Sequence, residues 1–109
     1  DTEDEIDRIT AIAGSGSGYV FEIARSYPAA AEEMGFAPDT ARALVLETLS
    51  GAIEMARQSD LSLEELRNSV MSKKGTTEAG INALRRDGWL DQLLLETTGA
   101  AYQRAVELR

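Results

Sequence analysis

The sequence contains no cysteine and no histidine among its 109 residues. Without cysteine the chain can form no disulfide, no thiolate metal site and no cysteine nucleophile. Without histidine it lacks the commonest general base and the usual ligand sets of zinc and iron. We therefore expect no metal site in this chain.

Basic residues are scarce as well. Eleven lysines and arginines stand against 19 acids, which gives a net charge of −8. A surface that follows nucleic-acid phosphates is disfavoured by this balance. No apolar run approaches the roughly 20 residues of a membrane helix, and no signal peptide heads the chain. The absence of cysteine fits a reducing compartment, and the expected location is the cytoplasm. The chain begins with the acidic run DTEDE rather than with Met, and we expect it to be a piece of a longer protein.

The apolar residues of the sequence recur with the period of an α-helix. Helices are predicted over residues 18–36, 38–59, 62–70, 76–88 and 90–109. In the second of these, the inward-facing residues are predicted to be Ala41, Leu44, Val45, Leu49, Ala52, Ile53 and Ala56. Gly51 lowers helix propensity there, which suggests close contact with another helix, and Trp89 is expected to bury its ring at a helix junction. The prediction is an all-α bundle of about five to six helices, forming one domain over residues 1–109.

One stretch, ITAIAGSGSGYVFEIA at residues 9–24, imitates a strand, a glycine-rich turn and a helix. A dinucleotide-binding unit begins in this way, but it needs a second strand with an acidic residue about 20 positions later. At that distance the sequence reads AEEMGF, the end of a predicted helix. A flexible turn of small residues between two helix ends is therefore favoured.

The turn at residues 72–77, SKKGTT, is the segment that stands out chemically. Backbone amides at a helix start, together with hydroxyl groups and lysines, can hold a carboxylate or a phosphate. Alternatively, Thr76 or Thr77 simply caps the helix. Spacing alone does not decide between these interpretations. The adjacent acidic pairs Glu32/Glu33 and Glu64/Glu65 point in different directions on their helices, and a solvated face is the favoured interpretation for them.

Three quoted segments resemble the pyrroline-5-carboxylate reductase family: DEIDRITAIAGSGSGY, VMSKKGTTEAGINAL and RDGWLDQLLLETTGAAYQRAVEL. The resemblance implies a fold like the C-terminal domain of 6-phosphogluconate dehydrogenase, which dimerises by intertwining. It implies an oxidoreductase of proline biosynthesis that reduces pyrroline-5-carboxylate to proline with NADPH or NADH. The cofactor would be bound by an N-terminal Rossmann domain that this chain does not include, so no cofactor-binding residue is expected here.

The resemblance also implies site residues. Ser72, Thr76 and Thr77 match residues that hold the substrate carboxylate, and Gly75 matches the glycine that permits its close approach. Thr10 matches a threonine that hydrogen-bonds the ring nitrogen and is the catalytic candidate.

The turn departs from the family pattern at Lys73 and Lys74, which stand where proline and glycine are common. A non-catalytic, reductase-like dimerisation module therefore remains an alternative, as does another C-terminal domain of the β-hydroxyacid-dehydrogenase type. A homodimer, or a higher oligomer built from it, is the expected assembly.

Overall fold

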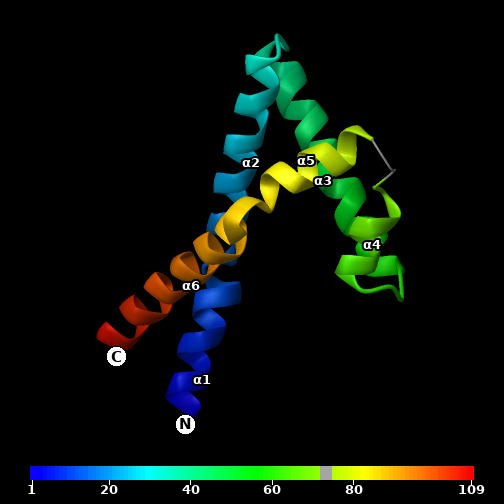
Figure 1. Ribbon diagram of the computed structural model, residues 1–109. Coiled ribbons are helices and arrows are strands. Elements are labelled where there is room, and N and C mark those ends of the chain that lie inside the picture. Colours follow the sequence, from blue (N-terminus) through cyan, green and yellow to red (C-terminus); the bar gives the residue numbers. More distant parts are fainter. Residues whose placement is uncertain (72–74) are drawn as a thin grey trace. The chain divides into compact units, whose positions relative to one another are not determined.

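The computed structural model describes residues 1–71 and 75–109, which contain six α-helices, one π-helix and one 3-10 helix. In chain order these are α1 (Thr2–Ile9), η1 (Thr10–Gly14), α2 (Gly16–Glu33), α3 (Pro38–Gln58), α4 (Leu63–Ser69), α5 (Thr76–Leu84), η2 (Arg86–Gly88) and α6 (Trp89–Glu107) (Figure 1). No strand occurs in the described residues. The all-α prediction is confirmed. The stretch that imitated a strand forms the end of α1, the π-helix and the start of α2.

The helix boundaries follow from local chemistry. Pro38 opens α3 at a position where its missing N–H leaves no helical bond unmade. Before it, Gly35 turns the chain with φ of +103°, a conformation that favours glycine. Ser62 and Glu65 form the predicted capping box: the Glu65 amide donates to Ser62 Oγ at 3.1 Å and the Ser62 amide donates to Glu65 Oε1 at 3.0 Å. These bonds hold the pKa of the Glu65 carboxyl below its usual range.

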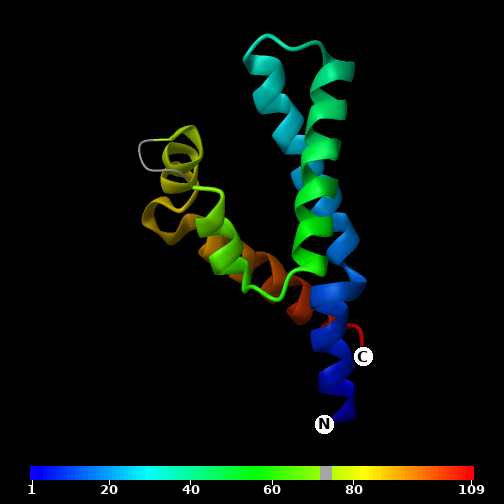
Figure 2. The ribbon, with the colours of Figure 1, turned by 90° about the vertical axis from the view of Figure 1, so that its right-hand side faces the viewer.

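The chain divides into two compact units, Asp1–Tyr19 with Ser72–Arg109 and Val20–Met71. In the first unit, α1 and η1 pack against α6, so the two ends of the chain lie side by side (Figures 1 and 2). Its buried residues in the described segments are Asp7 and Ala11. This unit contains every residue that the sequence assigns to a site.

The second unit contains most of α2, all of α3 and α4. Helices α2 and α3 are joined by the short turn at residues 34–37 and run as a hairpin (Figure 2). Pro28 on α2 and Ala41 and Val45 on α3 are its buried residues. Ala41 and Val45 lie one turn apart, so the predicted inner stripe of α3 is confirmed at these two positions.

Other parts of the predicted core are wrong for a single chain. Leu44 and Ile53 are 46% and 60% exposed, and Trp89 is 59% exposed instead of buried. A Cβ atom added to Gly51 would meet nothing within 4 Å beyond its own helix backbone. These residues have the apolar character of a core, yet each large side chain among them is about half exposed or more.

Across the described residues, no helix combines the length and the apolar composition required to span a membrane.

Candidate anion site and the turn that carries Thr10

Helix α5 begins without a side-chain cap. Gly75 is the N-cap residue, with φ of −86° and ψ of 166°, and its carbonyl accepts the first helical bond from the Ala79 amide at 3.3 Å. The amides of Thr76, Thr77 and Glu78 precede that bond and have no helical acceptor. Neither threonine caps the helix, because no side-chain cap bond is made. The capping interpretation of Thr76 and Thr77 is therefore wrong.

The start of α5 has the properties of an anion site. Thr76 and Thr77 are exposed and Gly75 is half-buried, so the backbone at the helix start and both hydroxyls are within reach of a ligand. The helix dipole places partial positive charge here. Glu78 places a negative charge in the first turn. A bound anion would have to overcome repulsion from this charge through direct hydrogen bonds to the helix start. Gly75 has a φ that any residue can adopt, so close approach of a ligand, not backbone strain, would be the reason for glycine.

Three residues of the predicted turn, Ser72, Lys73 and Lys74, lie outside the described residues. The predicted carboxylate contact through Ser72 stays a prediction, as does the contribution of the two lysines.

Thr10 lies elsewhere in the first unit. It is exposed and is the first residue of the π-helix η1. The main packing partners of η1 are α1 and α6. The start of α5 lies away from η1 in both views of the ribbon (Figures 1 and 2). Within one chain, the π-helix that begins with Thr10 and the start of α5 therefore share no main packing contact.

A polar network that the sequence did not predict joins α1 to the C-terminal end of the chain. The Tyr102 hydroxyl donates to Asp4 Oδ1, and Arg109 Nε donates to Asp7 Oδ2 at 2.6 Å. Arg8 also pairs with Asp4, at 3.0 Å. The hydrogen bond from Tyr102, aided by Arg8, holds the pKa of Asp4 below its usual range, and the same bond raises the pKa of Tyr102. The acidic run at the start of the sequence is thus partly a docking surface for α6.

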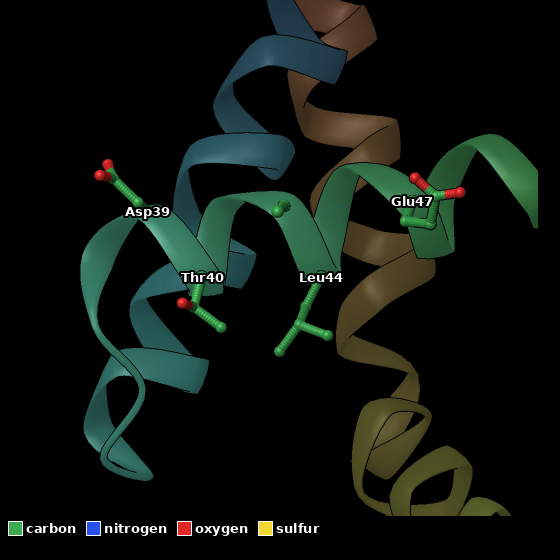
Figure 3. A pocket seen from close by; sticks show the side chains of 5 residues that line it. Asp39, Thr40, Leu44 and Glu47 are labelled. Carbon is green, nitrogen blue, oxygen red and sulfur yellow. The ribbon is translucent and has the colours of Figure 1, made fainter.

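Two shallow recesses lie on the hairpin of α2 and α3. The first is a patch of α3 alone, lined by Asp39, Thr40, Ala43, Leu44 and Glu47. Figure 3 shows Thr40 and Leu44 projecting to the same side, with the carboxylates of Asp39 and Glu47 at the two ends. Walls from one helix cannot enclose a small ligand, so this patch is suited to packing against another helix.

The second recess runs between the two helices and is mainly apolar. Its lining residues are Val20, Phe21, Ala24, Leu46, Leu49, Ser50, Ile53, Glu54 and Arg57. No predicted site residue lies in either recess. The candidate chemistry stays with Thr10 and the start of α5.

Solved structures define the class of protein to which this fold belongs. A pyrroline-5-carboxylate reductase from Coxiella burnetii superposes with a TM-score of 0.92 at 40% identity, covering 99% of this chain and 40% of that one. The Plasmodium falciparum pyrroline carboxylate reductase, solved with NADP bound, gives a TM-score of 0.88 at 27% identity, covering 94% of this chain and 38% of that one. The fold is that of the helical part of such reductases.

Sequence comparison identifies the family. The family described as "Pyrroline-5-carboxylate reductase dimerisation" matches residues 3–108. The pyrroline-5-carboxylate reductase of Pseudomonas aeruginosa is 40% identical over 108 residues, which are 99% of this chain and 39% of that protein. Pyrroline-5-carboxylate reductase 2 of Bacillus subtilis is 37% identical over 107 residues, 98% of this chain and 38% of that protein. The chain belongs to the pyrroline-5-carboxylate reductase dimerisation family, and it spans about two fifths of the length of these curated relatives.

Proposed function

We propose that this chain is the dimerisation and substrate-binding domain of an enzyme that reduces pyrroline-5-carboxylate to proline. Family membership over residues 3–108 supports the reaction. The uncapped start of α5 is the observation that supports the substrate site, because it offers amide and hydroxyl donors to a carboxylate in a chain of net charge −8.

In this proposal the chain contributes mainly by positioning. The amides of α5 and the hydroxyls of Thr76 and Thr77 hold the substrate carboxylate. The hydroxyl of Thr10 hydrogen-bonds the ring nitrogen and orients the imine carbon. Holding the reacting group in one geometry removes much of the entropic cost of the reaction.

The cofactor of the whole enzyme, NADPH or NADH, supplies the hydride. The described residues form helices alone and offer no strand–turn–helix cradle for a dinucleotide. We propose that a separate domain of the parent holds the cofactor. The NADP bound to the Plasmodium falciparum relative supports a pyridine nucleotide as the cofactor.

We further propose that the chain forms a homodimer. Two features support this: large apolar side chains are exposed on several helices, and α6 is apolar around much of its circumference. Consecutive residues Leu93, Leu94 and Leu95 are 59%, 40% and 67% exposed, and at 100° per residue they span more than half of the helix. A helix of this kind is normally buried. A second copy with the same apolar surfaces is the partner that buries both sets at once.

The function is tested with the full-length parent protein, supplied with pyrroline-5-carboxylate and either reduced nucleotide. Proline formation matched to cofactor oxidation is the expected result. A folded parent that binds neither the imine nor the nucleotide would instead identify the chain as a non-catalytic dimerisation module.

A further inference from the structure

The turn that carries Thr10 is wider than an α-helical turn. The Ser15 amide donates to the Thr10 carbonyl, five residues back, at 2.8 Å. In an α-helix this amide would donate to the Ala11 carbonyl, four residues back. The Ala11 carbonyl is therefore left without its helical donor. Ala11 is only 2% exposed, so water is a poor substitute, and a buried acceptor needs a partner.

Tyr19 provides that partner. Its hydroxyl donates to the Ala11 carbonyl at 2.7 Å, across eight positions of the sequence. The tyrosine lies in the first turns of α2 and is half-buried. Its hydroxyl thus occupies the acceptor that the Ser15 amide would use in an α-helical register. The bond favours the π-helical turn over the α-helical alternative.

The choice between these registers decides what lies beside the Thr10 side chain. Closing the turn in the α-helical register removes one residue from it and rotates the start of α2 relative to α1 by about 100°. The γ-methyl of Thr10 now lies beside Gly14, where an added Cβ would be 3.6 Å away. A change of register would alter this contact, and with it the surroundings of the Thr10 hydroxyl. Single π-turns are frequent at functional sites.

We propose that Tyr19 is a positioning residue for the reduction, which fixes the Thr10 hydroxyl by holding the π-helical turn open. This inference rests on the role proposed above for Thr10. Tyr19 acts through Thr10 and does not itself touch the substrate. Removing the Tyr19 hydroxyl should slow turnover while the carboxylate contacts at α5 keep substrate affinity unchanged.

The test is a double-mutant cycle in the full-length parent with Tyr19→Phe, Thr10→Val and the double variant. Tyr19→Phe should lower kcat about tenfold with KM within about twofold. Because Tyr19 works through Thr10, the double variant should be no slower than Thr10→Val alone. Tyr27→Phe is the matched control on the same helix. Its side chain is 46% exposed, and its kinetics should equal those of the wild type.

A second measurement reports the turn directly. Deuterium exchange of the backbone amides at residues 10–16 should change in Tyr19→Phe and stay unchanged in Tyr27→Phe. If the two substitutions lower kcat multiplicatively in the double variant, or if deuterium exchange at this turn is unchanged, the proposed role of Tyr19 is overturned. The proposed role of Thr10 would still stand. Wild-type kinetics in Thr10→Val would overturn the proposed role of Thr10, and the positioning role would be lost with it.

Discussion

Arg109 donates a hydrogen bond of 2.6 Å from Nε to Oδ2 of Asp7, and so joins residues 102 positions apart in the chain. Asp7 is 8% exposed and is the buried charged residue of the described segments. A buried carboxylate that loses its partner carries an uncompensated charge. The pair therefore fixes the end of α1, directly before Thr10, against the C-terminal end of α6.

Replacing Arg109 should destabilise the protein more than replacing a neighbouring arginine. Arg109→Met leaves Asp7 buried and unpaired, and we expect its melting temperature to fall by several degrees. Arg104→Met is the control, because Arg104 pairs with Glu107 at 3.4 Å on an exposed surface, where the two side chains are 67% and 49% accessible. Exposed ion pairs contribute little to folding stability. Equal melting temperatures for the two variants would show that the Arg109 pair is not a structural tie.

The bond between Tyr102 and Asp4 predicts that the folded protein loses stability both at low pH and at high pH. The pKa of Asp4 is lowered in the folded protein. Its contribution to folding stability is therefore fully present above about pH 4 and is lost as the pH falls through the folded-state pKa. The pKa of Tyr102 is raised in the folded protein. Its contribution to folding stability is therefore fully present below about pH 10 and is lost as the pH rises through the folded-state pKa. Melting temperature measured from pH 2 to pH 11 should decline at both ends.

Tyr102→Phe is the matched control for this profile, because it keeps the ring and removes the bond. The variant should melt lower at neutral pH and show a flatter decline at both extremes. A variant whose profile runs parallel to that of the wild type would assign the pH limits to other groups.

Thr77 should matter for substrate and not for folding. A hydrogen bond to a charged group contributes roughly 1.5–3 kcal/mol, so Thr77→Ala in the full-length parent should lower kcat/KM about tenfold to a hundredfold. Its melting temperature should stay near that of the wild type, since Thr77 makes no cap bond. Thr77→Val, which keeps the shape, should behave in the same way.

Gly75→Ala separates the two possible reasons for glycine at the start of α5. Its φ of −86° suits alanine, so the variant should fold normally. A raised KM would indicate that the methyl group blocks a ligand that approaches the backbone closely. Wild-type kinetics in both Gly75→Ala and Thr77→Ala would place the carboxylate elsewhere.

This chain alone should not catalyse the reduction. The described residues offer no dinucleotide cradle, and the sequence has no histidine or cysteine to act chemically in its place. An absorbance assay with the imine and a reduced nucleotide should match the blank without protein. Steady cofactor oxidation by the purified chain would contradict the assignment of the cofactor to a separate domain.

Local chemistry was readable from the sequence, and contacts between distant residues were not. The capping box at Ser62 and Glu65 and the opening of α3 at Pro38 each depend on residues within a few positions. The ties from Asp4 and Asp7 to the far end of the chain span about 100 positions, and the spacing of charges gives no signal for such pairs. The π-helical turn was missed because Ser15 and Tyr19 compete for one carbonyl, and helical periodicity does not report that competition.

The error on Trp89, Leu44 and Ile53 has a different cause. Their apolar character predicts burial, but the sequence does not say whether the same chain or a second copy would provide the cover. For the candidate anion site, both the residue types and the resemblance to the family indicated residues 72–77, whereas the missing side-chain cap at Gly75 became visible only in the structure.

The most direct test of the account is the mass of the chain in solution. If the exposed apolar faces of α2, α3 and α6 are covered by a second copy, light scattering at micromolar concentration should give twice 11.8 kDa. The same mass should persist on dilution through that range, because an interface that replaces a missing core is of the obligate kind. A folded species of 11.8 kDa under these conditions would contradict the proposal that this chain is a dimerisation domain.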